Sequence, residues 1–504
     1  MTGVRKQVNG LVEKVLDIKL SQPVYWTDIK DDSRQISPGD AFVALPSYSG
    51  KDGDIYIEKA IENGAAFILR DAYNEELSCE EIAAAGKHIP CLTIPNLREK
   101  HGEIISHFLG LPSAQVTVIG VTGTNGKTSV VNLISSSLDI LRVKCGMIGT
   151  LGFGSNPKNL EKISYTTPCA VELHGIINKL VKNESQVCAM EVSSHAIDQG
   201  RISGVYFDIG VLTNTSHDHL DYHGTMAEYR SCKEKLFYET PLQHIVINLD
   251  DELGERIFLK GHPTATIIAF TFKVHGKRKD VAYCSVTDQS LSGQTISIFY
   301  SGQNLKIKSQ LTGQYNAENI VTAFLTLNAM GYSPSKIVTV LEQVTHIPGR
   351  FEVIHSENGP TVIVDYAHTP DALKNVLMTL QQVTESKIWC VFGCGGDRDR
   401  DKRAPMGVIA EKYADYVVLT SDNPRSEVPE SIIEDIKKDM IANWAIHQQT
   451  DRVEAIRWAI ANADSDDVVL VAGKGHETSQ IFSTKRIDHS DSDVVKSCLD
   501  ESRL

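Results

Sequence analysis

The sequence has no pair of cysteines spaced as CxxC, although it contains ten cysteines in 504 residues. Scattered cysteines argue against a zinc site or a disulfide framework, and they are typical of reduced thiols in a cytosol. No apolar run approaches the roughly 18 residues that a membrane-spanning helix needs, and the N-terminus lacks the apolar segment of a signal peptide. We therefore expect a cytoplasmic protein without membrane insertion.

Basic residues are also fewer than acidic residues. The 50 lysines and arginines are outnumbered by 64 aspartates and glutamates, which gives a net charge of −14. Because this charge repels nucleic acid except at a local basic patch, we expect no nucleic-acid partner. The length exceeds what one hydrophobic core can hold and predicts roughly two to four domains.

Apolar runs and turn signals divide the chain into three blocks, residues 1–112, 113–347 and 348–504. In the last block, strand-like and helical patterns alternate, which predicts a parallel sheet with helices on both faces. The strand-like runs there are 361–365, 387–392, 416–420 and 467–472, and the helical patterns are 370–383, 403–414, 429–443 and 451–463. The other blocks contain strand-like runs at 40–45, 65–69, 116–119, 187–192, 207–212, 244–248 and 264–272, and a β-rich region at 281–310.

The segment GVTGTNGKTS at 120–129 carries the clearest chemical signal. It follows the apolar run 116–119 and precedes apolar residues that recur at helical spacing. A glycine-rich turn between a strand and a helix binds phosphate through backbone N–H groups and the helix dipole. Lys127 adds a cation for the β- and γ-phosphates, and the hydroxyl of Thr128 is a ligand for Mg²⁺. Although Val121 occupies the position of the usual first glycine, the segment predicts the use of a nucleoside triphosphate.

Polar clusters follow two further strand-like runs of the central block. Glu191 ends one run, and the segment Asn214–His223, rich in His and Asp, follows the other. Ligands of open α/β sheets bind at the carboxyl ends of strands, which favours Glu191 as a metal ligand and 214–223 as part of a site. On sequence alone, the alternative to a metal ligand at Glu191 is a carboxylate that caps the next helix, and Thr166–Pro168 is more often a simple turn than a site.

Together these motifs resemble the Mur ligase family. The segments that carry the resemblance are TGTNGKTS, YTTP, EVSSHAIDQGR, HDHLDYHG, Tyr229–Lys233 with Leu236–Phe237, GQYNAEN, PGRFE and DYAHTP. They run through all three blocks in order. The resemblance implies a three-domain α/β protein: a small α/β N-terminal domain (1–112) that binds the UDP-sugar, a central P-loop-containing parallel-sheet ATPase domain (113–347), and a Rossmann-like C-terminal domain (348–504) that binds the amino acid.

The resemblance also implies a reaction, ATP-dependent amide ligation in cytoplasmic peptidoglycan-precursor synthesis. The γ-phosphate of ATP would pass to the D-Glu side-chain carboxylate of UDP-MurNAc-L-Ala-D-Glu, and an amine would attack the resulting acyl phosphate. A carboxylate and a triphosphate repel each other, so bound cations such as Mg²⁺ must neutralise both. We expect small-molecule substrates and a monomer.

Roles at the nucleotide follow from the positions that match the family. The phosphate loop would be formed by Gly123, Thr124, Asn125, Gly126, Lys127, Thr128 and Ser129. Asn316 would contact adenine, Arg350 would reach the triphosphate, and Asp365 with His368 would lie against the nucleoside. Pro348–Gly349 is a candidate hinge and equally a plain linker.

The resemblance implies four Mg²⁺ ligands: Thr128, Glu191, His219 and Lys233, the last as a carbamate formed with CO₂. The implied catalytic residues are Lys127, Glu191, His219, Lys233 and Arg350. A carbamate forms only on an amine that has lost its proton, so Lys233 should be buried near cations. Without the family context, Lys233 is indistinguishable from a surface lysine.

The sugar-nucleotide contacts implied by the resemblance lie in the first two blocks. They are Ser33, Thr166, Thr167, Ser194, Gln199 and Arg201. Ser33 belongs to the segment Asp32–Asp40, which with Ser49–Gly53 would receive the uridine diphosphate. Taken alone, Asp32–Asp40 is a turn signature.

Two amines divide the close relatives, meso-diaminopimelate and L-lysine, which differ by one distal carboxylate. The segment Asp422-Asn423-Pro424-Arg425 resembles the DNPR motif of the diaminopimelate-adding enzymes, and the planar fork of Arg425 suits a carboxylate. Arg398, Gly473 and Glu477 would complete the pocket. We therefore expect meso-diaminopimelate as substrate and L-lysine as a very poor one. Without the family context, the alternative to a binding motif is an Asx/Pro turn with an exposed arginine.

Two other functions are alternatives: a folylpolyglutamate synthetase-like ligase and a regulator that binds ATP without catalysis. The first lacks the sugar-nucleotide signature and the DNPR motif, and the second needs no pair of metal sites. His217 and Cys232 depart from the family pattern, and neither is an implied metal ligand.

Overall fold

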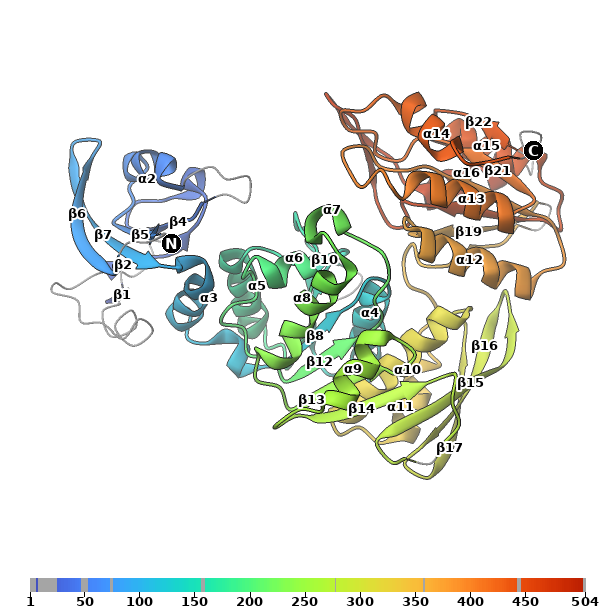
Figure 1. Cartoon of the computed structure of the whole chain (residues 1–504), viewed down its shortest axis with the longest axis horizontal. Helices are drawn as coiled ribbons and strands as arrows, with labels where there is room; N and C mark the ends of the chain where they lie inside the picture. The colour runs from blue at the N-terminus through green and yellow to red at the C-terminus, as the bar shows by residue number, and fades with distance from the viewer. Residues whose placement is uncertain are drawn as a thin grey trace. The chain divides into compact units, whose positions relative to one another are not determined.

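The computed structural model describes residues 6–7, 25–46, 53–72, 76–155, 159–276, 278–356, 359–441 and 446–501. Its contacts divide the chain into two compact units. The first comprises Met1–Gly120, Arg142–Gly210 and Lys235–Leu242, and the second comprises Val121–Leu141, Val211–Glu234 and Gln243–Leu504. Three sheets of five, ten and six strands, each accompanied by helices, confirm the predicted three-domain α/β fold (Figure 1). The limits at 112/113 and 347/348 stay predictions.

The five-stranded sheet lies in the N-terminal part of the chain. Its order is β3 (Ile29–Lys30), β4 (Ala41–Ala44), β5 (Phe67–Ala72), β7 (Lys87–Pro95) and β6 (Ser78–Ala84). All pairings are parallel except the β6–β7 hairpin. Helices α2 (Ile57–Glu62) and α3 (Leu97–Phe108) accompany it, and α3 packs on a core that includes Trp26 and Phe67. The shorter elements are β1 (Lys6–Gln7), β2 (Tyr25–Trp26), η1 (Ser33–Gln35), η2 (Gly53–Tyr56) and η3 (Pro112–Gln115).

The ten-stranded sheet contains the phosphate-loop strand near its middle. Its order is β10 (Gly152–Gly154), β9 (Cys145–Gly149), β11 (Val187–Glu191), β8 (Thr117–Thr122), β12 (Ile209–Leu212), β13 (His244–Asn248), β14 (Thr266–Thr271), β15 (Val281–Ser290), β16 (Gly293–Tyr300) and β17 (Gln303–Ser309). The predicted β-rich region is the antiparallel meander β15–β16–β17 at one edge. Strands β8 and β11 are buried almost throughout, which explains why they read as continuous apolar runs.

Helices connect the strands of this sheet, and two more helices follow its last strand. They are α4 (Lys127–Ile140), α5 (Ala170–Lys182), α6 (Ser194–Asp198), α7 (Leu220–His223), α8 (Met226–Tyr238), α9 (Glu252–Lys260), α10 (Gln314–Ala329) and α11 (Pro334–Leu341). In α4, the residues Val130, Leu133, Ile134 and Leu138 are buried, as their helical spacing predicts.

The six-stranded sheet forms the C-terminal domain. Its order is β18 (Glu352–Ile354), β19 (Thr361–Asp365), β23 (Val468–Ala472), β20 (Ile388–Phe392), β21 (Tyr416–Leu419) and β22 (Ile446–Gln448). All pairings are parallel except that of β18. The helices are α12 (Pro370–Val383), α13 (Arg403–Tyr413), α14 (Pro429–Lys437), α15 (Arg452–Asn462) and α16 (Asp491–Glu501). One core cluster joins the sheet to α12, α13 and α14, and another joins it to α15 and α16, so helices cover both faces as predicted.

Some elements of this domain differ from the sequence-based prediction. The helix predicted at 429–443 is wrong in its length, because α14 ends at Lys437. Ile441 is 87% exposed, so a longer helix would gain no apolar packing there. The short strands β18 and β22 and the hairpin β24 (Ser479–Ile481) with β25 (Arg486–Asp488) were not predicted, because three-residue strands carry no recognisable period.

Two further features bear on the composition-based expectations. All ten cysteines lie within the described residues, and none forms a disulfide. Across the described ranges, no helix combines the length and the apolar character needed to cross a bilayer.

Candidate active site

The phosphate loop lies between β8 and α4. Gly123 has a φ of +148°, and a Cβ there would lie 1.9 Å from Thr213 Oγ1. Gly126 precedes α4 with a φ of +87°, and no side chain caps the first turn of this helix. The N–H groups of a helix start need acceptors, and a phosphate supplies them. Val121, at the position of the usual first glycine, is buried inside β8, where the backbone is extended and glycine is not required.

Polar residues that follow β12 form hydrogen bonds with this loop. Thr124 Oγ1 hydrogen-bonds the Tyr229 hydroxyl at 2.9 Å and accepts from the N–H of Ser216 at 2.9 Å. Asn125 N–H donates to Asn214 Oδ1 at 3.0 Å. Ser129 is buried in the first turn of α4. The predicted loop residues and the segment that begins at Asn214 are therefore in direct contact.

Cationic side chains converge on the loop. Lys127 Nζ donates to the carbonyls of Gly123 at 2.9 Å and Thr124 at 3.0 Å. Arg350 Nη2 donates to Thr128 Oγ1 at 3.1 Å, and its guanidinium lies 4.4 Å from the centre of the Tyr366 ring. Within the described residues, Arg350 Nε is buried without a hydrogen-bond partner. A buried donor without an acceptor is costly, and a phosphate oxygen would satisfy it.

Lys233 is buried directly beside the loop, with 1% of its surface exposed. Its Nζ donates to the Gly123 carbonyl at 3.0 Å and lies 4.6 Å from the centre of the Tyr229 ring. Burial, and then the positive charge of Lys127, lower the pKa of Lys233 well below its ordinary value. The neutral amine that carbamate formation requires is thus favoured here. The carbamate itself stays a prediction.

His219 directly precedes α7 and has a left-handed backbone (φ +54°), and 47% of its side chain is exposed. Its Nε2 lies 3.4 Å from Asp218 Oδ2. Burial raises the pKa of Asp218, but the electrostatic influence of the neighbouring basic groups, first of all His219, outweighs burial and lowers that pKa. In the part of the chain that the structure describes, no three His, Cys, Asp or Glu side chains are grouped to hold a metal. A metal here would need donors such as the Thr128 hydroxyl, a carbamate and phosphate oxygens.

Residues predicted for the nucleoside are held by local hydrogen bonds. Asn316 is buried in α10 and donates from Nδ2 to the Thr312 carbonyl at 2.8 Å. Both carboxylate oxygens of Asp365 accept backbone N–H groups at 2.7 Å, and burial raises the pKa of this carboxyl. His368 Nδ1 lies 2.9 Å from the Tyr366 carbonyl, so this nitrogen carries the proton. Burial, and then the charge of Lys402, lower the pKa of His368 to about 4, which keeps its ring neutral at pH 7.

Glu191 ends β11 in the first unit and is almost fully buried. Its two carboxylate oxygens accept from the backbone N–H of Thr150 at 2.8 Å and from the Thr150 hydroxyl at 3.3 Å. The following helix α6 is capped by Ser193, whose Oγ accepts from Ala196 N–H. The reading of Glu191 as that cap is therefore wrong.

Most residues predicted for the sugar nucleotide lie around Glu191. Thr150 Oγ1 hydrogen-bonds Thr166 Oγ1 at 3.1 Å, and Thr167 Oγ1 donates to the Glu191 carbonyl at 2.9 Å. Arg201 donates to the Thr167 carbonyl at 3.0 Å and to Gln199 Oε1 at 2.9 Å. The buried Ser194 starts α6.

Ser33 is buried in η1 of the N-terminal domain. The carboxylate of Asp32 accepts from Arg34 N–H at 2.9 Å, so this segment is a turn whether or not it binds a ligand. Residues 49–52 of the second predicted segment lie outside the described residues, and Gly53 starts η2.

Three loops at the carboxyl ends of β20, β21 and β23 bring together the residues predicted for the amine. Asn423 Nδ2 donates to Glu477 Oε2 at 2.9 Å, while Asn423 Oδ1 accepts from Lys474 Nζ at 3.1 Å. Lys474 Nζ also donates to Glu477 Oε2 at 2.7 Å. Gly473 has a φ of +113°, and a Cβ there would lie 2.8 Å from the carboxylate of buried Asp422.

Arg425 follows buried Pro424 and has a left-handed backbone (φ +50°). Its Nη1 donates to the Gly396 carbonyl at 2.7 Å. Burial, and then the charge of exposed Arg398, lower the pKa of Arg425, which still remains protonated. Two arginines whose charges interact beside Asn423 and Glu477 form a site able to hold a carboxylate and an ammonium group.

The comparisons with known proteins agree with this geometry. The Mur ligase middle domain matches residues 121–327, and the Mur ligase, glutamate ligase domain matches residues 349–475. The Coxiella burnetii protein named UDP-N-acetylmuramoyl-L-alanyl-D-glutamate--2,6-diaminopimelate ligase is 38% identical over 499 residues, which cover 98% of this chain and 100% of that protein. The chain belongs to the Mur ligase family.

Other relatives of this Mur ligase carry the same name. The Chromobacterium violaceum ligase is 40% identical over 473 residues, which cover 94% of each protein. A solved structure of a UDP-N-acetylmuramoyl-L-alanyl-D-glutamate--2,6-diaminopimelate ligase is 31% identical and has a TM-score of 0.69, covering 99% of this chain and 100% of its own.

Sequence reasoning missed three side chains of the Mur ligase site. Tyr229 supports Thr124 and Lys233, Tyr366 supports Arg350, and Lys474 connects Asn423 to Glu477. Tyr229 and Tyr366 stand inside the motifs that carry the resemblance, and Lys474 stands between Gly473 and Glu477. The signal was therefore proximity in sequence, but their roles depend on contacts that only the fold creates.

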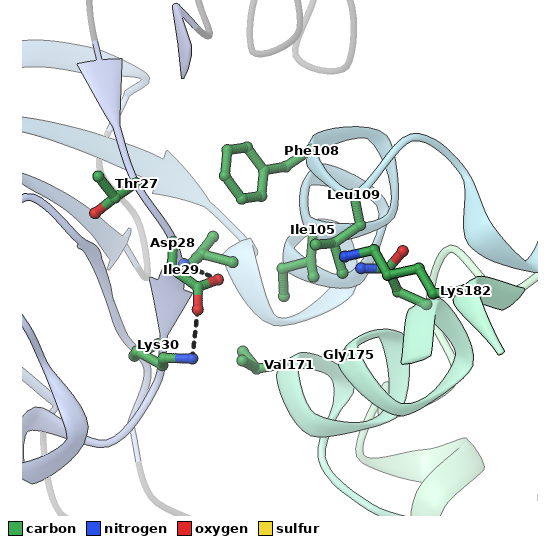
Figure 2. Close-up of a pocket in the computed structure, with 11 residues that line it drawn as sticks. Thr27, Asp28, Ile29, Lys30, Ile105, Phe108, Leu109, Val171, Gly175 and Lys182 are labelled. Atoms are coloured by element: carbon green, nitrogen blue, oxygen red, sulfur yellow. Dashed lines mark hydrogen bonds and ion pairs between the residues drawn. The ribbon is translucent and has the colours of Figure 1, made fainter. Parts of the chain in front are cut away.

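A separate cavity of about 450 Å³ lies in the first unit, between edge strand β3 and helices α3 and α5 (Figure 2). Ile105 and Phe108 of α3 line one side, and Asp28 accepts a hydrogen bond from Lys30 at 2.7 Å on the other. No residue predicted for the Mur ligase site lines this cavity. It is therefore distinct from the candidate active site.

Proposed function

We propose that this Mur ligase is an ATP-dependent ligase that joins meso-diaminopimelate to the D-Glu side-chain carboxylate of UDP-MurNAc-L-Ala-D-Glu in peptidoglycan-precursor synthesis. The observation that carries the proposal is the receptor at the ends of β20, β21 and β23, where Arg425, Asn423 and Glu477 stand together. Near-full-length relatives named as diaminopimelate ligases support it.

The first step is activation of the carboxylate. A carboxylate oxygen attacks the γ-phosphorus of ATP and forms an acyl phosphate. The bond between the γ-phosphorus and the oxygen that bridges it to the β-phosphate breaks, and ADP leaves with that oxygen. Lys127 and Arg350 are the protein cations for the triphosphate, and the start of α4 supplies backbone N–H donors. Asn316 would contact adenine, and the neutral ring of His368 with Asp365 would adjoin the nucleoside.

Mg²⁺ is the ion that such chemistry requires, since it neutralises charge on phosphate and carboxylate oxygens. The residues proposed to hold it are Thr128, Glu191, His219 and Lys233 as a carbamate. The buried, proton-poor amine of Lys233 fits this role because CO₂ adds to a neutral amine and converts a cation into an anion.

The second step is attack by the amine. The amine nitrogen attacks the acyl carbon, the bond to the phosphate oxygen breaks, and a proton leaves the nitrogen as phosphate departs. Arg425 and Arg398 would bind the distal carboxylate of diaminopimelate, and Asp422, Asn423 and Glu477 would receive its distal ammonium group. Pro424 and Gly473 shape the backbone between these side chains.

The nucleotide-peptide would occupy the polar residues around Glu191. Thr166, Thr167, Ser194, Gln199 and Arg201 are proposed to bind its MurNAc and diphosphate portions, and Ser33 its uridine portion. Hydroxyl groups and one arginine suit an anionic sugar nucleotide, because diphosphate oxygens accept hydrogen bonds from both.

ADP formation tests this proposal when UDP-MurNAc-L-Ala-D-Glu is offered with a panel of amines. Turnover that requires both the nucleotide-peptide and meso-diaminopimelate supports it. Preference for L-lysine would assign the chain to the lysine-adding ligases, and glutamate transfer to a folate would favour the folylpolyglutamate alternative. ATP binding without turnover for any amine would favour the regulator.

Two finer features are part of the same proposal, a monomeric state and a cytoplasmic location. Light scattering of the purified chain tests the first, and fractionation of cells that express it tests the second. A stable dimer or a membrane-bound fraction would contradict the respective feature.

A further inference from the structure

Arg452, the first residue of α15, is buried in the C-terminal domain. Its Nε and Nη2 atoms donate to the two carboxylate oxygens of Asp491, each at 2.8 Å. His489 Nε2 lies 2.7 Å from the same carboxylate. The interaction with Arg452 holds the pKa of Asp491 far below its ordinary value although burial opposes this, so the pair is ionic. None of these three residues lies in the sequence motifs that point to the site.

The same guanidinium also contacts two strand ends. Arg452 Nη2 donates to the carbonyl of Ala472 at 2.9 Å, and Nη1 donates to the carbonyl of Ser421 at 3.3 Å. Ala472 is the last residue of β23 and directly precedes Gly473, and Ser421 directly precedes Asp422. One buried cation therefore bridges the starting points of the two loops that carry the proposed amine receptor.

We propose that the Arg452–Asp491 pair is a positioning device that sets the separation of these two loops and thereby the affinity for the amine substrate. This inference rests on the proposed function. Asn423 and Glu477 stand on different loops and hydrogen-bond each other at 2.9 Å, so a shift of either loop changes the receptor itself. Arg452 acts through these residues and touches no substrate.

Stability alone is a weak explanation for such a pair. Replacement of a buried ion pair by apolar residues is often neutral or stabilising, because burial of two charges costs nearly as much as their attraction returns. The geometry of Arg452 instead fits a role in holding the two loops in place relative to each other. Its planar guanidinium binds Asp491 on one side, while its remaining hydrogen bonds reach two backbone carbonyls.

The test compares Arg452→Lys and Arg452→Met with Arg457→Met, a matched change at a half-exposed arginine of the same helix. The KM values for meso-diaminopimelate, ATP and the nucleotide-peptide are measured together with the thermal midpoint. We expect the KM for diaminopimelate to rise about tenfold or more in the Arg452 variants, because misplaced charged hydrogen bonds lose this much binding. The KM for ATP should change less than about twofold, and Arg457→Met should match the unsubstituted enzyme.

Arg452→Lys keeps the charge and guards against the case in which Arg452→Met does not fold. Equal changes in all three KM values that track the thermal midpoint would overturn the inference in favour of a merely structural role. An unchanged KM for diaminopimelate in Arg452→Lys, with normal turnover of the unsubstituted enzyme, overturns the inference but leaves the proposed function intact. Absence of diaminopimelate-dependent turnover in the unsubstituted enzyme refutes both.

Discussion

Replacement of Arg425 by methionine should erase much of the discrimination between meso-diaminopimelate and L-lysine. Arg425 Nη1 is engaged by the carbonyls of Gly396 at 2.7 Å and Asn423 at 3.4 Å. Among the described residues, Nε and Nη2 have no protein hydrogen-bond partner in the structure, which leaves them for a ligand carboxylate. Methionine retains a side chain at the left-handed backbone position, so the substitution adds no new backbone strain.

The magnitude follows from the hydrogen bonds that are lost. A hydrogen bond to a charged group contributes about 1.5–3 kcal/mol, so kcat/KM for meso-diaminopimelate should fall by about 10- to 150-fold. L-Lysine has no distal carboxylate, and its kcat/KM should change by less than about twofold. Because the intact site should reject lysine by roughly 10⁴-fold, the variant should still prefer diaminopimelate, but by a much smaller ratio.

The assay is ADP release at saturating ATP and nucleotide-peptide, with each amine varied in turn. Arg457→Met, at a half-exposed arginine of α15, is the control and should leave both amines unaffected. The reasoning is refuted if Arg425→Met lowers kcat/KM equally for both amines. It also fails if the unsubstituted enzyme ligates lysine and diaminopimelate at comparable rates.

Three further predictions concern the phosphate loop and the C-terminal domain. Lys233→Gln should lower kcat by roughly 100-fold or more. Because the pKa of Lys233 is depressed, its amine gains a proton only as pH falls, so the activity of the intact enzyme should drop at low pH and in CO₂-depleted buffer. Full activity under those conditions would contradict the carbamate. Gly126→Ala places a Cβ 2.3 Å from an amide oxygen at a φ of +87°, so the KM for ATP should rise about tenfold. The control Gly175→Ala, whose Cβ meets nothing within 4 Å, should leave this KM unchanged. Equal KM values for the two variants would argue against the loop geometry. A hydrogen bond from Arg403 lowers the pKa of Glu427 to about 2, so this carboxylate stabilises the fold above about pH 4.5, and its contribution is lost as pH falls toward 2. Glu427→Gln should therefore flatten the dependence of the urea midpoint on pH in this window. An unaltered slope would show that the Arg403–Glu427 pair does not cause this dependence.

The sequence was informative where a local pattern determines a local structure. The phosphate loop was predictable because Gly123 and Gly126 have backbone conformations that other residues rarely adopt, and because a strand and a helix flank them. The strands of the C-terminal sheet were predictable because burial on both faces makes each a continuous apolar run. The resemblance, rather than any pattern, pointed to Lys233 and Asn316.

The remainder depends on contacts between residues that are distant in sequence. Arg452 and Asp491 are 39 positions apart, and neither stands in a recognisable motif. The orientation of the Asn423 amide is fixed by Lys474 and Glu477 from another loop. The reading of Glu191 as a helix cap was open until the structure placed Ser193 in that role. Such arrangements are set by tertiary packing, which a periodic pattern does not encode.

The central claim, that the D-Glu carboxylate is phosphorylated before the amine attacks, is tested most directly by isotope transfer. UDP-MurNAc-L-Ala-D-Glu carrying ¹⁸O in both oxygens of the D-Glu side-chain carboxylate is incubated with the enzyme, ATP and meso-diaminopimelate. Mass spectrometry of the products should find one labelled oxygen in the released phosphate and the other in the new amide. Released phosphate without label, formed in step with the amide product, would contradict the account.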